Sequence, residues 1–466
     1  MPSDISTNKE AHSRKKAVQR SIMTHINAWT ERRLTRLEKR DGDHRNAYQR
    51  DKARIMHSAA FRRLQAKTQV LGIGISDFYR TRLTHSLEAA QIGTGIAAQL
   101  TQKQPDISAK LGVDEHLIES LCLAHDIGHP PFGHGGEIAL HYMMHEHGGF
   151  EGNGQTFRIL TKLETYSPSD GMNLARRTLL GLIKYPNYID ILTNHHLETD
   201  KPESHRLVKS KQWHPPKGLY SCDKDAFDWV VAPLSLSDQH RFIEFSVGDN
   251  RHSKTCYKSI DCSIMELADD IAYAIHDLED AIVMSMVTRD SFEAEVVTPL
   301  KKLKLPWLSA QIDVLTGNLF SSAPYERKNA IGALVNCFIT AISIQKQGLF
   351  ESAIIDYNAQ FEQHYQVALG LFKSFVFNYV IRKPELQLLE YKGQQIVMAL
   401  FEAFSSEPER LLPTNTAKRW IEAGSDIAKH RVLADYISGM TDEYATRLYN
   451  HLFLPKSNSA TDSLSP

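Results

Sequence analysis

Hydrophobic residues recur every three to four positions along most of this chain, which is the spacing of amphipathic helices. Stretches with this pattern cover residues 80–100, 117–124, 264–278, about 325–380, 388–404 and 415–452. The alternating pattern of a half-buried strand is rare by comparison. The sequence therefore predicts an all-α protein.

Three of these predicted helices have a recognisable first turn or buried face. Asp77 or Ser76 is placed to cap the first helix, and Asp114 is placed to cap the second. The residues expected to be buried are Leu83, Leu87, Ala90 and Ile96 in the first helix, Leu117, Ile118, Leu121 and Ala124 in the second, and Ile264, Leu267, Ile271, Ala274, Ile275 and Leu278 in the third.

Residues 198–224 interrupt the helical pattern with charged residues, prolines and a glycine. We expect a long loop here with room for one short hairpin, and loops of this length are usually functional or mobile. Residues 1 to about 20 and those after Leu454 have the polar composition of loose tails. The basic cluster from Arg14 to Arg20 fits either a solvated tail or contact with an anion or nucleic acid.

The amino-acid composition argues against several classes of protein. The 466 residues include 54 Lys plus Arg against 55 Asp plus Glu, and the net charge of −1 argues against a generally basic coat for nucleic acid. The five cysteines are too few and too scattered for a disulfide framework or a thiolate zinc site. The chain start lacks the apolar stretch of a secretory signal, and no window approaches the roughly 18–20 apolar residues of a membrane span. We therefore expect a cytoplasmic protein that does not enter a membrane.

Histidine is the residue type with an unusual distribution. The chain has 22 histidines, and eight of them lie between His85 and His147. Candidate metal-binding and catalytic side chains are densest between His125 and Glu137. Here a predicted helix ends in an adjacent His-Asp pair followed by a glycine and two prolines. Imidazole and carboxylate groups together suit Mn, Fe, Co, Ni or Zn, or Mg where oxygen ligands dominate.

An isolated His-Asp pair is more often a cap than a metal site, but two remote helices offer further ligands. His85 lies on the predicted helix over residues 80–100. Asp269, Tyr273 and Asp277 are spaced i, i+4, i+8 and form a polar stripe roughly opposite the apolar stripe of residues 264–278. This helix either lines a cavity with its polar face or exposes solvated acids, and Tyr273 within the stripe favours the cavity.

The order of these residues resembles the H…HD…D metal signature of the HD superfamily of phosphohydrolases. Six segments extend the resemblance to the deoxyguanosine triphosphate triphosphohydrolase (dGTPase) family, in the family's order: residues 54–70, 82–88, 125–137, 266–273, 386–404 and 431–445. The resemblance implies an HD-domain helical core with additional C-terminal helices. The corresponding division is a polar N-terminal arm (1–40), the HD core (41–290), a C-terminal helical region packed on the core (291–453) and a disordered tail (454–466).

The same resemblance implies a reaction and a cofactor. The family hydrolyses a deoxynucleoside triphosphate to the deoxynucleoside and inorganic tripolyphosphate; dGTP is the default substrate, and many bacterial members accept several dNTPs. One divalent ion per subunit (Mn, Mg, Co, Ni or Fe) is expected. Its ligands would be His85, His125, Asp126 and Asp269.

The resemblance also assigns roles around the scissile bond. His134 would be the catalytic histidine, Glu137 would orient it, and His129 would contact the α-phosphate or the leaving oxygen. A neutral imidazole can move a proton near pH 7, and a carboxylate fixes its tautomer. The substrate contacts would come from Arg54 and Arg82 at the phosphates, Gln69 and Val70 at the sugar and base, and Tyr273 and Asp277 at the sugar.

Two positions depart from other members of the superfamily. Residues 150–156 stand where vertebrate-type relatives carry a further histidine, which leaves the second proton-transfer partner open. Asp270 stands where some relatives place a lysine, which removes one phosphate contact. The other histidines of the cluster are expected to have no direct role: His116, His141, His145 and His147.

Two other functions stay open. One is a different HD phosphohydrolase reaction, such as that of a 5′-nucleotidase or a cyclic-nucleotide phosphodiesterase, which would share the metal ligands but not the segments 54–70 and 130–137. The other is a nucleotide- or single-stranded-DNA-binding regulator with weak turnover. The resemblance further implies a homo-oligomer, often a hexamer, with a dNTP or single-stranded DNA as a candidate effector.

Overall fold

Helices dominate the computed structural model, which describes residues 28–35, 41–69, 80–197 and 202–455. The strands of this part of the chain form two antiparallel two-stranded sheets, β1–β2 (Phe245–Ser246 with Lys254–Thr255) and β3–β4 (Ile342–Lys346 with Tyr357–Phe361). The prediction of an all-α protein is confirmed. None of the described helices is both long enough and apolar enough to cross a membrane.

The helices fall into two successive groups along the chain. The first group is α2 (Ala47–His57), α3 (Ala59–Arg63), α4 (Arg82–Lys103), α5 (Pro105–Leu111), α6 (Glu115–Ala124), α7 (Gly133–Met144), α8 (Gly152–Arg158), α9 (Arg176–Leu182), α10 (Ile189–Leu192), α11 (Lys224–Val231), α12 (Leu236–Phe242) and α13 (Ile260–Val283). The second group is α14 (Arg289–Phe292), α15 (Thr298–Lys302), α16 (Leu308–Leu319), α17 (Pro324–Thr340), α18 (Ala353–Asp356), α19 (Gln363–Val376), α20 (Pro384–Ser406), α21 (Pro408–Leu411), α22 (Thr414–Glu422), α23 (Asp426–Ser438) and α24 (Asp442–Phe453).

Short turns connect or extend these helices. Those of 3-10 type are η1 (Leu64–Ala66), η2 (His145–His147), η4 (His195–Leu197), η5 (His205–Leu207), η6 (Ser210–Gln212) and η7 (Ser221–Asp223). Those of π type are η3 (Ile159–Leu163), η8 (Glu293–Val297) and η9 (Phe377–Ile381).

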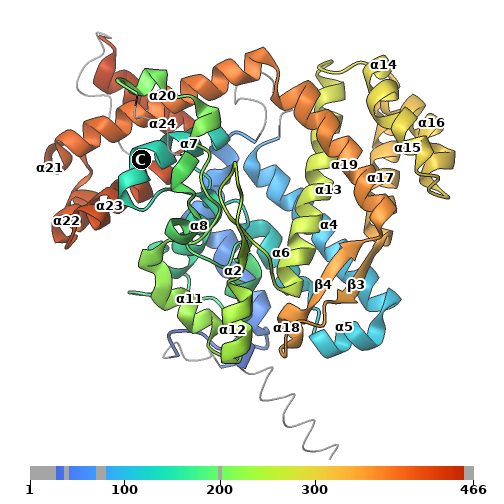
Figure 1. The fold of residues 1–466 in the computed structure, drawn as a ribbon, viewed down its shortest axis with the longest axis horizontal. Coiled ribbons are helices and arrows are strands. Elements are labelled where there is room, and N and C mark those ends of the chain that lie inside the picture. Colours follow the sequence, from blue (N-terminus) through green and yellow to red (C-terminus); the bar gives the residue numbers. More distant parts are fainter. Residues whose placement is uncertain (1–27, 36–40, 70–79, 198–201, 456–466) are drawn as a thin grey trace, which may run out of the picture.

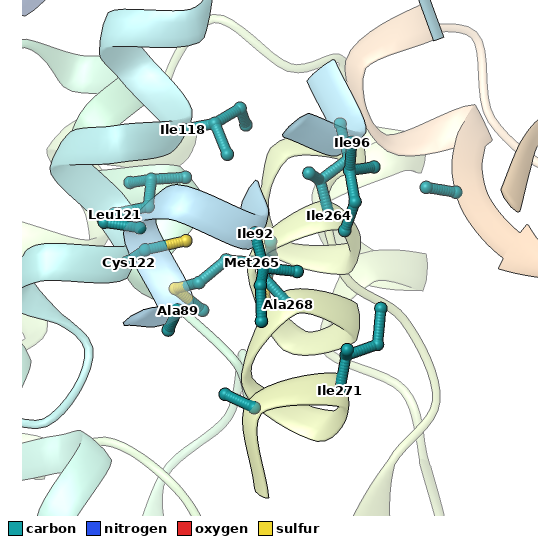
Figure 2. Close-up of a cluster of buried hydrophobic side chains, with 14 of the residues drawn as sticks. Ala89, Ile92, Ile96, Ile118, Leu121, Cys122, Ile264, Met265, Ala268 and Ile271 are labelled. Atoms are coloured by element: carbon teal, nitrogen blue, oxygen red, sulfur yellow. The ribbon is translucent and has the colours of Figure 1, made fainter. Parts of the chain in front are cut away.

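The centre of the larger hydrophobic core is the contact between α4, α6 and α13. Figure 2 shows the side chains that make it, which include Ile92 of α4, Leu121 of α6 and Ile264 of α13. Gly93 lies where the helices approach closely, since a Cβ atom there would stand 2.7 Å from Cys122 Sγ. A larger residue would push the helices apart. This packing fixes the start of α4, the end of α6 and the middle of α13 relative to one another.

The predicted buried faces of two of these helices are confirmed. Asp114 caps α6 by accepting a hydrogen bond from the backbone of Leu117, and the predicted stripe of α6 is fully buried. The stripe of α13 is buried as well, except that Leu267 is only half-buried.

The prediction for α4 was partly wrong. Leu87 is 46% exposed, and the face that packs into the core includes Ala89 and Ile92 instead. Asp77 and Ser76, the predicted N-caps, lie outside the described residues and do not adjoin the helix. The cap is Thr81, whose hydroxyl accepts from the backbone of Thr84. A threonine directly before the first turn supplies the oxygen that the free N–H groups require.

A second hydrophobic cluster joins α7 to α20, α23 and α24. In Figure 1, α20–α24 lie on the left beside α7, whereas α14–α17 and α19 lie on the right, beyond α4 and α13. Helices α17 and α19 belong to the larger core together with α4 and α13. Packing therefore crosses residue 290, which is the boundary drawn from the sequence between the HD core and the C-terminal region. That division stays a prediction.

Two stretches differ from the pattern expected of them. The amphipathic stretch 325–380 is not continuous helix, because the hairpin β3–β4 separates α17 from α19. Ile342 and Ile344 are buried on alternate positions of β3, and five residues are too few for this alternation to stand out in the sequence. The short hairpin suggested for 198–224 is also wrong for its described part, residues 202–224, which contains the turns η5, η6 and η7 and no strand. Prolines in this segment lack the N–H group that a strand ladder needs.

Candidate active site

Three of the side chains predicted as metal ligands, His85, His125 and Asp269, have ligand atoms within 4.8 Å of one another where α4, α6 and α13 meet, and the fourth, Asp126, contacts His125. His85 lies in the first turn of α4, His125 and Asp126 directly follow α6, and Asp269 lies in the middle of α13. His85 Nε2 is 3.0 Å from Asp269 Oδ1, and His125 Nε2 is 3.4 Å from both Asp269 Oδ1 and Asp126 Oδ1. Atoms that share one metal ion at about 2.1 Å stand about 3 Å apart. The packing of three helices thus creates a site with the spacing of a ligand set.

The orientation of His125 and the ionisation of the two carboxylates fit a divalent cation. His125 Nδ1 donates to the Cys122 carbonyl at 2.6 Å, which leaves Nε2 as the nitrogen with a lone pair. This Nε2 atom is buried without a hydrogen-bond partner. Burial alone would raise the pKa values of Asp126 and Asp269, but the neighbouring His129 and Lys184, respectively, help to hold both well below their usual range. Two ionised carboxylates and a lone-pair nitrogen in one place are what a cation requires.

Each carboxylate is also held by a neighbouring basic side chain. Arg82 Nη1 lies 2.7 Å from Asp126 Oδ2, and Lys184 Nζ lies 3.1 Å from Asp269 Oδ2. His129 Nδ1 lies 3.1 Å from Asp126 Oδ1. These contacts orient the carboxylates, so that Asp269 Oδ1 faces both His85 and His125, whereas Asp126 Oδ1 faces His125 and His129. Outer contacts of this kind tune the affinity of a metal site.

The predicted catalytic pair is formed at the start of α7. His134 Nδ1 lies 3.3 Å from Glu137 Oε2, one helical turn away. Glu137 is buried and its other oxygen accepts from the backbone of Gly152 at 2.7 Å. Burial would raise the pKa of Glu137, but the hydrogen bond and charge of His134 hold it well below its usual range. An ionised, anchored carboxylate therefore fixes the tautomer of a His134 side chain that is 69% exposed.

The turn between α6 and α7 depends on close packing against α8. A Cβ atom at Gly128 would stand 2.2 Å from the carbonyl oxygen of Gly152, so only glycine fits here. The Gly128 amide donates to Thr156 Oγ1 at 3.1 Å. Since Gly152 also donates to Glu137, the first turn of α8 supports both the turn that follows His125 and Asp126 and the His134–Glu137 pair.

A cavity of about 900 Å³ opens over these residues. Its lining includes His85, Asp126 and Asp269 together with His129 and His134. Further lining residues come from η9, α20 and α24, far away in the sequence. The volume is in the range of small-molecule sites, so the cavity has room for a nucleotide.

The predicted substrate contacts divide into two sets. Gln69, Arg82 and Tyr273 line the cavity. Asp277 is buried on α13, does not line the cavity, and has its pKa raised to about 7 by burial. Val70 lies outside the described residues.

Arg54 is placed elsewhere. Its guanidinium donates to the carbonyl oxygens of Met172 and Asn173 at 2.8 and 2.5 Å, and it is not among the residues that line the cavity. The Nη1 group, which was expected to contact a phosphate, therefore donates to backbone carbonyls instead. The geometry brings Arg54 into no contact with the rest of the site.

The cavity also contains residues that were not predicted, among them Lys184, Tyr185 and Lys217. Burial would lower the pKa of both lysines, but Asp269 raises that of Lys184 and Tyr185 raises that of Lys217, so both are cations near neutral pH. Lys217 lies in the loop 198–224, whose length predicted a functional or mobile segment, so the sequence did point to this region. Lys184 lies just after α9, and no feature of the sequence pointed to it.

The remaining histidines of the cluster stand outside this cavity: His116, His141, His145 and His147. His141 is buried and accepts from the backbone of Phe150. His145 stacks on Tyr142 and packs edge-on against Trp213. Their expected lack of a direct role stays a prediction.

Family models and related proteins match this chain. The HD domain model matches residues 82–228, and the phosphohydrolase-associated domain model matches residues 359–451. A relative from Shewanella halifaxensis is 59% identical over 92% of this chain and 97% of its own length. A second, from Shewanella pealeana, is 58% identical over 93% of this chain and 98% of its own length. Both carry the name deoxyguanosinetriphosphate triphosphohydrolase-like protein.

Proposed function

The chain belongs to the dGTPase family of the HD superfamily of phosphohydrolases, and on that premise we propose that it hydrolyses deoxynucleoside triphosphates to a deoxynucleoside and inorganic tripolyphosphate. One observation carries the proposal. His85, Asp126, Asp269 and His134 line the same cavity, where His125 contacts Asp126 and Asp269, and Glu137 contacts His134. A phosphohydrolase needs both: charge neutralisation at the phosphates and a group that moves a proton.

His85, His125, Asp126 and Asp269 would hold a divalent cation, one per subunit. Such a cation, when bound, would supply Lewis-acid stabilisation of charge on the phosphate that is attacked. The chain adds cations of its own, because Arg82, Lys184 and Lys217 all line the cavity. A triphosphate carries several negative charges, which the divalent cation and these three side chains together would neutralise.

The reaction joins a water oxygen to the α-phosphorus and breaks the bond from that phosphorus to the 5′-oxygen of the sugar. A proton must leave the water and reach the 5′-oxygen. His134 is suited to exchange this proton, because Glu137 holds its Nδ1 side and stabilises the charged imidazole. His129, which also lines the cavity, is suited to contact the α-phosphate or the leaving oxygen.

Tyr273 is the residue that would select deoxyribose. It lies one helical turn after Asp269 on α13 and lines the cavity. An aromatic ring against C2′ of the sugar would leave no space for a 2′-hydroxyl. Gln69, on the rim formed by the segment before α4, would contact the sugar or base.

The test is to incubate the protein with each of the four dNTPs and either Mn²⁺ or Mg²⁺ in ¹⁸O-labelled water, and to separate the products. Tripolyphosphate carrying the label, together with unlabelled deoxynucleoside, is the expected result. Pyrophosphate with a monophosphate, or single orthophosphate, would contradict the proposal and favour another HD phosphohydrolase reaction. His116→Ala, outside the cavity, is the matched control for substitution of His134.

A further inference from the structure

A second group of metal-binding side chains lies away from the cavity, at the contact between η2 and α23. It consists of His147, Asp426 and His430, whose ligand atoms all lie within 4.8 Å of one another. His147 Nδ1 is 3.3 Å from Asp426 Oδ2, and His430 Nδ1 is 3.4 Å from Asp426 Oδ1. His430 Nδ1 also donates to the backbone carbonyl of Asp426 at 3.0 Å, a hydrogen bond that an ion bound to this atom would replace. None of the three lines the cavity of the candidate active site.

The backbone that carries these side chains is held in place by other contacts. Asp426 is the first residue of α23 and His430 follows one turn later, so both side chains share a helix face. Arg431 joins α23 to the segment after His147, because its guanidinium donates to the carbonyls of Gly148 and Gly149 at 3.1 and 2.6 Å. The three side chains are therefore brought together by the fold, whether or not an ion is bound.

We propose that His147, Asp426 and His430 form a second metal site, for a divalent transition ion of the Zn²⁺, Ni²⁺ or Co²⁺ class. Two imidazoles with one carboxylate favour these ions over Mg²⁺ and Ca²⁺, which prefer oxygen ligands. Three protein ligands leave the fourth tetrahedral position to water. Asp426 is 71% exposed on its side chain, which leaves room for that water.

Ion binding changes the arrangement of the two rings. The imidazoles of His147 and His430 are stacked with centroids 3.7 Å apart and planes 2° from parallel. The lone pairs of a ring nitrogen lie in the ring plane, and those of two parallel rings do not meet at one point. Binding must therefore tilt one ring, so loss of the stack is a direct signature of an occupied site.

The location gives the site a structural role. His147 falls within the region matched by the HD domain model, whereas Asp426 and His430 fall within the region matched by the phosphohydrolase-associated model. An ion here joins the two regions. Five residues beyond His147, Gly152 donates to the catalytic Glu137, so the ion also restrains the segment that supports this carboxylate.

Zn²⁺ binding to the full-length protein tests the proposal, and it does so without dNTP turnover. The Asp126→Ala variant, impaired at the active site, should still bind one Zn²⁺ per chain by isothermal titration and elemental analysis. Adding His147→Gln and His430→Gln to that variant should weaken this binding at least 10-fold. His240→Gln, an exposed histidine of α12, is the control and should leave it unchanged.

Two outcomes would overturn the proposal: no Zn²⁺ bound by Asp126→Ala, or equal affinity with and without the two glutamine substitutions. Circular dichroism establishes that each variant is folded. Asp426→Asn, on the exposed first turn of α23, provides a milder second variant and should also weaken Zn²⁺ binding. Shifts of the His147 and His430 ring resonances on Zn²⁺ addition, measured by NMR in the Asp126→Ala background, should accompany binding, and unchanged resonances would contradict it.

Discussion

Replacing Lys67 with methionine should make the free energy of unfolding less dependent on pH between about 7 and 9. Lys67 is 2% exposed, and its ammonium group donates to the carbonyl oxygens of His129 and Ser438 at 2.6 and 2.8 Å. It therefore connects the turn after His125 and Asp126 to the end of α23. A neutral amine still has two N–H groups, so loss of the proton need not break either hydrogen bond.

The expected magnitude follows from the pKa of this group. Burial is the largest cause of a pKa lowered from 10.5 to about 7. Between these two values the unfolded chain binds the proton and the folded protein does not, so the contribution of Lys67 to stability rises with pH. At 1.36 kcal/mol per pKa unit, raising the pH from 7 to 9 should stabilise the wild type by about 2 kcal/mol relative to the Lys67→Met variant.

Urea denaturation at pH 7, 8 and 9 measures this difference. The control is Lys302→Met, an exposed lysine of α15, whose difference from the wild type should stay constant over the same range. A constant difference for Lys67→Met would refute the reasoning, because it would mean that Lys67 keeps an ordinary pKa when buried. A difference that falls with pH would refute it as well.

Three predictions concern the active site. Asp126→Ala should lose the metal ion of the active site and activity together, so that only the ion proposed at His147, Asp426 and His430 remains. His134→Ala should keep the active-site metal and lose turnover by about 100-fold or more, as expected for a group that moves a proton. Elemental analysis with steady-state kinetics separates the two, and near-full turnover by His134→Ala would refute its role. Lys217→Met should lower kcat/KM for a dNTP by about 10-fold or more, because one charge-assisted phosphate contact contributes roughly 1.5–3 kcal/mol. An unchanged kcat/KM would mean that Lys217 does not contact the substrate. Tyr273→Ala should reduce the preference for dNTP over NTP, measured as the ratio of kcat/KM values, and an unchanged ratio would remove Tyr273 from sugar selection.

The parts of the fold predicted well from the sequence are those set by local interactions. Asp114 capped α6 as expected, because a cap and its helix are only a few residues apart. The buried face of α13 followed from apolar spacing, and the polar stripe opposite it does reach the cavity through Asp269 and Tyr273. The metal-ligand candidates could be named because the order His85, His125-Asp126, Asp269 resembles a known signature. Apolar spacing alone would not have selected them.

The parts that could not be predicted depend on contacts between distant segments. Arg54 resembled a phosphate-binding residue, but its Nη1 group donates to the carbonyls of Met172 and Asn173, more than a hundred residues away, and it does not line the cavity. Lys184 reaches Asp269 in the same way, and nothing near it in the sequence marks a charged residue as part of a site. A helical pattern identifies which face of a helix is buried, but it does not identify what that face meets.

The C-terminal helices illustrate why the division of the chain at residue 290 is incomplete as a description of the site. Asp442, the first residue of α24, accepts from the backbone and hydroxyl of Thr68 at 2.9 and 2.5 Å, and from the backbone of Phe132 at 2.9 Å. One buried carboxylate at a helix start thereby fixes both the segment that carries Gln69 and the turn that precedes His134. Lys67, the residue before Thr68, donates to the carbonyl oxygen of Ser438 at the end of α23 and so links the same two parts of the chain. The late part of the chain therefore lines the cavity through α20 and α24 and also holds the segments that carry Gln69 and His134, so both parts of the chain build the site.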